Sequence, residues 1–480
     1  MPRDERGAKP MTAQELLKQL NLTTIPGEWY DRVRGWLDWY GGKADFHSYR
    51  VYNGERFQSR ERASLSMAKK VCEDKADLLL NEKVTITVEG GEMQAFVDDV
   101  LHANNFWVRG NQMVEIASAT GTGAFTEFLQ ADGAIGMDYI PAQCIFPLSW
   151  ENRRIVECAF ASARTEMGKA QTYVNVHRRE NGLYVVENYL FDDKGTPLPL
   201  PEGVEARWET GCDVPMFQIY TPNIVNNLPV GGQSAINFPM GVSVFAGAID
   251  VLKGIDLIYD SYNNEFQLGK KRIFVDGSVL KIDKGTGADK PIFDTNDTVF
   301  YSFPMGDTTG DSSPQKIVES NMTLRAEQHE QGLQSQLSLL SEKCGFGKGY
   351  YRLDAEGSVQ TATAVVSQNS QLFRKIKKDE IILYDVLTNM VRAILFLGGH
   401  PVDVDISIGF DDSIIEDTEA IARRALLEFG AGIIDEVEYI QRVYGHTEEA
   451  AQELVNTMRK RKPVEELYDP SEGGVSHVDT

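Results

Sequence analysis

The residues that could carry chemistry do not combine into a recognisable catalytic pattern. The segment GFGKG, residues 345–349, resembles a phosphate-binding loop, but such a loop reads GxxxxGK followed by Ser or Thr, between a strand and a helix. Here a helical pattern precedes the segment, and Gly349 follows Lys348. The segment is therefore predicted to be a flexible connection, and GTG at 121–123 a turn.

Metal sites and acid–base pairs are not predicted either. The seven histidines form no HExxH motif and do not pair with cysteine, and the five cysteines are scattered without a CxxC, which favours reduced thiols. Any two of the 71 acidic residues could form a glycosidase-type pair, but the spacing selects none. We predict no catalytic residue, no cofactor and no metal; a hydrolase with an acidic pair that the spacing hides stays an alternative.

The net charge limits how the protein could interact with nucleic acid. At 480 residues the chain should form two to four domains, and its formal charge of −23 argues against tight wrapping of nucleic acid, which requires Lys and Arg. An acidic surface repels DNA and suits its passage better than its capture. Neither a run of about 18 apolar residues nor an apolar segment near the N-terminus is present, so we expect no transmembrane helix and no secretory signal.

Two matched helices with an insertion between them organise the chain. In 249–272, apolar residues recur at helical spacing: Ile249, Leu252, Ile255, Tyr259, Tyr262 and Phe266. A polar stripe beside them is expected to face water: Asp250, Lys253, Asp256, Asp260 and Asn264. The basic cluster Lys270, Lys271 and Arg272 is predicted to close the last turn. A second, glutamine-rich helix is predicted over 323–343, with short strands at 273–275, 279–282 and 298–303 between the two.

The remaining elements predict an α+β fold. Residues 124–220 alternate with a period of two, which indicates antiparallel strands, and ENG at 180–182 fits a hairpin turn. A connection follows over 223–239, and a strand is expected at 84–88 and another at 403–409. Helices are predicted over 11–42, 61–81, 93–105, 108–119, 359–397, 414–429, 435–444 and 447–462.

This order of elements resembles the portal proteins of tailed bacteriophages. Three stretches carry the resemblance, and they are similar to portals of siphophages and prophages of Gram-positive hosts. They read WYDRVRGWLDWYGG, then AIDVLKGIDLIYDSYNNEFQLGKKRIFV, and finally LLSEKCGFGKGYYRLDAEGSVQTATAVVSQNSQLFRK. The resemblance implies a structural protein rather than an enzyme, and a ring of twelve subunits at one capsid vertex. Double-stranded DNA would be pumped through the channel by the terminase and later ejected through it. A monomeric scaffold is the other alternative.

The resemblance also implies a division into regions. The wing would comprise residues 1–248 and 345–412, the stem 249–272 and 323–344, the clip 273–322, and the crown 413–480. The clip would dock terminase and a head-completion adaptor, and the particle would also contain major capsid and scaffolding proteins. Assembly would take place in the bacterial cytoplasm and the product would reside in the virion.

Three groups of residues acquire roles from the resemblance. A tunnel loop over 345–357 would line the narrowest part of the channel with Lys348, Tyr350, Tyr351 and Arg352, and would be poorly ordered without DNA; in the alternative, its two tyrosines pack into the wing core. Lateral stem contacts are expected from Leu252, Tyr259, Tyr262 and Phe266. The cluster of Lys270, Lys271 and Arg272 lies where stem meets clip; we predict a helix cap, and a contact with DNA or a partner stays the alternative.

Overall fold

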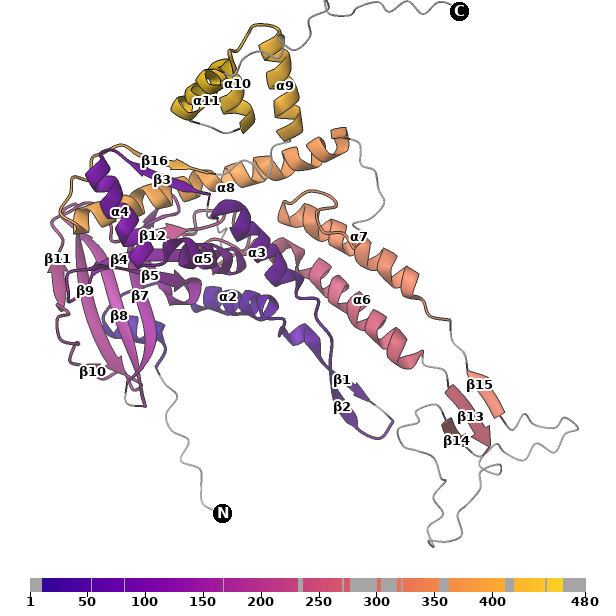
Figure 1. The fold of residues 1–480 in the computed structure, drawn as a ribbon. Helices are drawn as coiled ribbons and strands as arrows, with labels where there is room; N and C mark the ends of the chain where they lie inside the picture. Colours follow the sequence, from indigo (N-terminus) through magenta and orange to yellow (C-terminus); the bar gives the residue numbers. More distant parts are fainter. Residues whose placement is uncertain are drawn as a thin grey trace, which may run out of the picture. The chain divides into compact units, whose positions relative to one another are not determined.

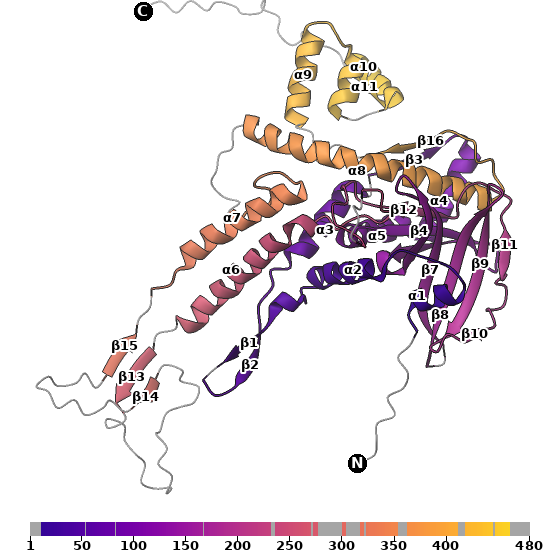
Figure 2. The same ribbon diagram turned by 180° about the vertical axis from the view of Figure 1, so that it is seen from behind.

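The computed structural model of the chain (Figures 1 and 2) describes residues 11–460, except 53, 82, 167, 232–235, 270–271, 277–299, 304–316, 321–322, 354–361, 411–417 and 445–446. It separates into two compact units. The first comprises Met1–Thr361 and Gln371–Phe410, and the second Ala362–Ser370 and Asp411–Thr480. The α+β class predicted from the sequence is confirmed by this mixture of helices and small sheets.

The N-terminal part of the first unit is mainly helical. Its elements are α1 (Ala13–Gln19), α2 (Gly27–Tyr40), β1 (Ser48–Tyr52), β2 (Phe57–Glu61), α3 (Met67–Leu79), β3 (Thr85–Val88), α4 (Gly91–Ala103) and α5 (Phe106–Thr120). The helical region predicted at 11–42 divides in two because Asn21 adopts a left-handed φ of 58° and Pro26 lacks the amide that a helix interior needs. The helix predicted from 61 begins at Met67, because Glu61 belongs to β2 and residues 62–66 form a connection without regular structure.

The antiparallel region predicted at 124–220 is confirmed. Its strands are β4 (Gly123–Leu129), β5 (Ile135–Pro141), β6 (Ile145–Glu151), β7 (Arg154–Glu166), β8 (Lys169–Glu180), β9 (Leu183–Asp192), β10 (Pro197–Leu198), β11 (Arg207–Glu209) and β12 (Phe217–Tyr220). One sheet has the order β10-β9-β8-β7-β6 with β11 beside β9, and another has the order β12-β4-β5. The ENG turn joins β8 to β9, with Asn181 at φ 51° and Gly182 at φ 89°, the signs that a tight hairpin requires.

A pair of long helices follows the sheets. Helix α6 (Ile249–Leu268) leads into a small sheet of β13 (Arg272–Asp276), β14 (Phe300–Phe303) and β15 (Ile317–Ser320), and α7 (Ala326–Cys344) returns. Figures 1 and 2 both show the two helices side by side. Helix α6 ends four residues earlier than predicted, so Arg272 belongs to a strand rather than to the last helical turn; Lys270 and Lys271 lie outside the described residues.

The C-terminal elements begin with the long helix α8 (Ala362–Leu397), close to its predicted bounds, and β16 (Ile406–Gly409), which pairs antiparallel with β3. The second unit contains α9 (Thr418–Gly430), α10 (Glu436–Tyr444) and α11 (Glu448–Lys460), as the sequence predicts. Ile440, Ala451 and Val455 form the small core of these three helices.

Candidate functional site

The stalk, defined here as α6 and α7, is an antiparallel helix pair with a close interface. A Cβ on Gly254 would lie 3.2 Å from the side chain of Gln336, and one on Gly332 would lie 3.6 Å from Ile258. The tight contact at Gly254 explains why a glycine stands inside this helix despite its low helix propensity, whereas a Cβ on Gly332 would make an ordinary van der Waals contact. Buried leucines of α7 complete the contact: Leu333, Leu337 and Leu340.

An ion pair closes the end of the stalk nearest β13 and β15. Glu265 accepts hydrogen bonds from the Nε and Nη2 atoms of Arg325 at 3.1 and 2.8 Å, and from its backbone amide at 3.2 Å. These hydrogen bonds lower the pKa of Glu265 to about 2. The pair thus fixes the position at which the chain leaves one stalk helix and re-enters the other.

Only part of the polar stripe of α6 faces water as the sequence predicted: Asp250 does, whereas Asp256 and Asp260 bind other segments. Asp256 is 4% exposed and accepts hydrogen bonds from His47 Nε2 at 2.8 Å, Ser64 Oγ at 3.0 Å and the amide of Leu65 at 2.8 Å. Asp260 accepts one from the amide of Ala63 at 3.0 Å. Helical periodicity could not reveal these partners, because they lie between 191 and 209 residues away in the sequence. Asp256 and Asp260 thus attach the stalk to the segment between β2 and α3.

The residues expected to make lateral stem contacts fall into different environments. Leu252 is 2% exposed and packs within its own subunit, so it has little surface to offer a neighbour. Tyr259 and Tyr262 are half-buried, and Phe266 is 43% exposed, with its ring 5.0 Å from that of Tyr262. The structure adds Leu257, which is 48% exposed and which the apolar stripe had not included. The lateral role of Tyr259, Tyr262 and Phe266 stays a prediction.

The first half of the expected tunnel loop folds back on α7. The amide of Phe346 donates to Ser341 O at 2.9 Å, and the amide of Tyr351 donates to Ser341 Oγ at 3.1 Å. The side chain of Gln334 donates to Tyr351 O and accepts a hydrogen bond from the amide of Leu353. Left-handed φ values at the three glycines 345, 347 and 349 make this tight path accessible.

The four side chains assigned to that loop differ in exposure. Tyr351 is 8% exposed, and burial, reinforced by the carboxylate of Asp74, raises the pKa of its hydroxyl above the usual range. Tyr350 is 41% exposed, with its ring 4.7 Å from Phe346, while Lys348 and Arg352 are exposed. Tyr351 thus packs inward as the core-packing alternative expects, whereas the other three reach the surface. Residues 354–357 lie outside the described part of the chain.

A buried ion pair holds the long helix to the body of the first unit. Lys75 Nζ of α3 lies 2.6 Å from Asp379 Oδ2 of α8, and both side chains are 7% exposed. The amide of Asn223 donates to Asp379 Oδ1 at 2.7 Å, and its side chain donates to Lys378 O at 2.7 Å. One carboxylate therefore joins three segments, and the sequence offered no signal for it.

The body also buries titratable groups, but their surroundings do not suggest catalysis. Burial lowers the pKa of His177 to about 3, and its ring lies 5.5 Å from Phe160 and 5.1 Å from Phe217. Glu127 is 2% exposed, and neither carboxyl oxygen has a hydrogen-bond partner among the described residues. Within that part of the chain no group of three His, Cys, Asp or Glu could hold a metal ion. In the same part, no helix has the length and apolar character to cross a bilayer.

We expect Glu127→Gln to stabilise the protein increasingly as pH rises. Burial raises the pKa of Glu127 well above its usual range, so folding favours the protonated form. The stability of the wild type is therefore unaffected by this group below the unfolded-state pKa of about 4.3 and decreases as pH rises toward the folded-state pKa. Thermal unfolding measures this. The free energy of unfolding of the variant should equal that of the wild type at pH 4 and exceed it by about 1–3 kcal/mol at pH 8.

A matched control uses a carboxylate that has donors. Glu157 accepts hydrogen bonds from Ser149 Oγ at 2.7 Å and from the amide of Arg179 at 3.0 Å. Glu157→Gln should not stabilise the protein at pH 8. A Glu127→Gln variant that gains nothing between pH 4 and pH 8 would contradict the assignment of a buried, unpaired acid.

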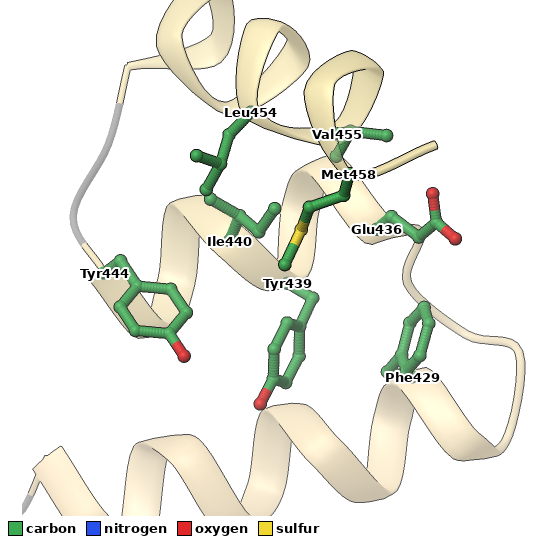
Figure 3. A pocket seen from close by; sticks show the side chains of 8 residues that line it. All are labelled: Phe429, Glu436, Tyr439, Ile440, Tyr444, Leu454, Val455 and Met458. Atoms are coloured by element: carbon green, nitrogen blue, oxygen red, sulfur yellow. The ribbon is translucent and has the colours of Figure 1, made fainter. Parts of the chain in front are cut away.

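An apolar groove of about 520 Å³ lies on the second unit (Figure 3). Its lining comes from the end of α9, from α10 and from α11: Phe429, Glu436, Tyr439, Ile440, Tyr444, Leu454, Val455 and Met458. Glu436 is the one carboxylate in this lining, so a pair of carboxylates for acid–base chemistry is not available among these residues. The groove fits packing against an apolar surface better than it fits catalysis.

Comparison with known proteins gives a family match and two structural similarities. The sequence matches the model described as "Phage portal protein, SPP1 Gp6-like" over residues 25–462. It is similar, at 9% identity and a TM-score of 0.40, to a chain in the neck of a native GTA particle computed with C12 symmetry, covering 89% of this chain and 98% of that one. A chain in the virion of the native gene transfer agent particle shows 10% identity and a TM-score of 0.35, with 79% and 88% covered. No curated protein sequence matches the chain.

Proposed function

The chain belongs to the SPP1 Gp6-like phage portal protein family, and from this premise we propose that it forms a closed ring at one vertex of a phage capsid. Double-stranded DNA enters through the channel of the ring during packaging and leaves through it during ejection, without sequence-specific contacts. The observation that carries the proposal is the extent of the family match, which runs from Ile25 to Lys462 and includes both stalk helices. Twelve subunits are expected from the family.

A structural role agrees with the chemistry of the chain. The portal family is a structural family and its members are components of phage particles. In this proposal the terminase supplies the energy for DNA movement, so the portal needs neither a nucleotide site nor a catalytic pair. A net charge of −23 disfavours adhesion of the phosphate backbone and suits a channel through which DNA must slide.

The surface of the stalk supports lateral association. Leu257 and Phe266 on α6 are 48% and 43% exposed, and Leu339 on α7 is 46% exposed. Exposed apolar side chains on a helix pair favour a protein partner. Leu257 and Phe266 are about two and a half turns apart on α6 and therefore lie on opposite sides of it, as contacts with a neighbour on each side require. In a cyclic ring each subunit would cover part of this surface on the next one. Terminase and a head-completion adaptor would dock on the clip, residues 273–322, of which the structure describes β13, β14 and β15.

We expect the full-length protein to form a ring whose mass is a multiple of 53.6 kDa, and Leu257→Asp or Phe266→Asp to weaken that ring. A charge buried in an interface should raise the subunit concentration needed for assembly about tenfold or more, equivalent to 1.4 kcal/mol or more. Native mass spectrometry across a dilution series measures this. Gln267→Asp, at a neighbouring exposed polar position, is the control and should assemble like the wild type. A wild-type protein that stays monomeric at micromolar concentration would overturn the proposed function.

A further inference from the structure

The β1–β2 hairpin exposes an apolar surface that no described residue of its own subunit covers. Its two strands pair only with each other among the described strands. Val51, Tyr52 and Phe57 are 43%, 57% and 62% exposed. A two-stranded hairpin is marginally stable in water without further packing. Its aromatic tip is thus a surface that association with another protein would stabilise.

One face of the hairpin combines the aromatic rings with positive charge. Tyr52 pairs directly with Phe57 across the strands, and Arg50 pairs with Ser59, so these four residues share a face. The rings of Tyr52 and Phe57 lie 5.3 Å apart, and the guanidinium of Arg50 lies 5.4 Å from the centroid of Phe57. We call these four residues the docking face. Arg60 pairs with Tyr49 and therefore lies on the opposite face.

The root of the hairpin is fixed while its tip extends away from it. The guanidinium of Arg62 lies 4.4 Å from the ring centroids of both Phe46 and Tyr49, and the next residue, Ala63, donates its amide to Asp260 of α6. Figures 1 and 2 both show the hairpin extending from the body in the direction in which α6 runs. The docking face is therefore presented by a rigid base beside the stalk.

The charge of the hairpin is opposite to that of the stalk. Residues 48–62 contain four arginines and two glutamates, in a chain whose net charge is −23. The two stalk helices contain seven acidic residues and two lysines. Glu327 and Glu330 are exposed in the first turns of α7. Phe266 is exposed at the end of α6 that Glu265 joins to Arg325 at the start of α7. Opposite charges around apolar contacts are the arrangement found at specific protein interfaces.

We propose that the docking face of one copy binds the stalk of a second copy of this chain, with Tyr52 and Phe57 against its Phe266 and Arg50 near Glu327 and Glu330. Within the described part of one subunit both surfaces stay uncovered, although the root of the hairpin is attached to its own α6. A cyclic ring uses two different surfaces of each subunit, so each copy can supply the hairpin to one neighbour and the stalk to the other. This inference rests on the proposed ring.

The test is a charge exchange between the two surfaces in the full-length protein. Arg50→Glu should raise the concentration needed for ring assembly about tenfold, measured by mass photometry, and Phe57→Ser should act in the same direction. Adding Glu327→Arg and Glu330→Arg to the Arg50→Glu chain should restore assembly, because the opposite charges then face each other again. Thermal unfolding of the subunit should be unchanged by Arg50→Glu, since the tip packs on no core.

The control changes the same charge on the opposite face. The concentration that Arg60→Glu needs for ring assembly should stay within about twofold of the wild-type value, because a charge directed away from the interface contributes little at 0.15 M salt. Normal assembly of the Arg50→Glu chain, failure of the stalk substitutions to restore it, or an equal defect in Arg60→Glu would each overturn this inference while the wild-type ring stands. A wild-type chain that forms no ring would instead overturn the proposed function.

Discussion

Replacing Gly121 by alanine should prevent stable folding of the first unit. A Cβ at this position would lie 2.4 Å from the carbonyl oxygen of Gly241 and 2.5 Å from its carbonyl carbon, distances that real Cβ atoms do not adopt. The obstacle is backbone, so no rotamer change relieves it. Gly121 also has a left-handed φ of 82° at the end of α5. We expect a loss of about 4 kcal/mol or more, measured as a lower midpoint in urea or as insoluble protein.

The position matters because the backbone at Gly121 lies directly against the backbone at Gly241, in the segment that leads to the stalk. Gly241 N donates to Thr122 Oγ1 at 3.1 Å, and Val244 N donates to Ser118 O at 2.9 Å, shortly before α6 begins. A matched control is Gly133→Ala, where φ is 84° but nothing lies within 4 Å of the added Cβ. That variant should lose only about 1–2 kcal/mol for the left-handed backbone. An equal loss of stability in the two variants would show that the left-handed backbone conformation, not the close contact with Gly241, determines the effect.

Removing the carboxylate of Asp379 should destabilise the first unit by about 3–5 kcal/mol. Asp379→Ala leaves Lys75, whose side chain is 7% exposed, charged and without its partner, and it deprives the amide of Asn223 of an acceptor. Desolvation of the remaining ammonium group accounts for most of the expected loss. Equilibrium unfolding in urea at pH 7 measures it, provided that the slope of the transition is unchanged.

A double substitution separates the charge effect from loss of packing. Lys75→Met with Asp379→Leu removes both charges, keeps similar volumes and should be much less destabilising than Asp379→Ala alone. Glu166→Ala, which removes an exposed partner of Arg164, should change stability by about 0.5 kcal/mol or less. If the double variant is as unstable as Asp379→Ala, the buried charge of Lys75 is not the cause.

The sequence determined most of the secondary structure, because local periodicity reports which side of a segment avoids water. The pattern over 359–397 predicted α8 to within three residues, and the ENG turn predicted the junction of β8 and β9. The order of these elements and the amino-acid sequences of three long stretches also indicated the portal family, and the family match confirms it. The strands β1, β2 and β15 were missed, since short strands carry little apolar alternation, and β1 and β2 are also mostly exposed.

The tertiary structure alone decided what each face contacts. The apolar stripe of α6 looked continuous in the sequence, yet Leu252 lies inside the subunit and Phe266 is exposed. The carboxylate of Asp256 looked like a solvated group, yet it binds His47 and the segment that follows β2. Hydrophobic periodicity gives the direction of a side chain relative to its own helix, but not the distant segment that packs there. That partner is selected by the whole chain, as the pairing of β3 with β16 also shows.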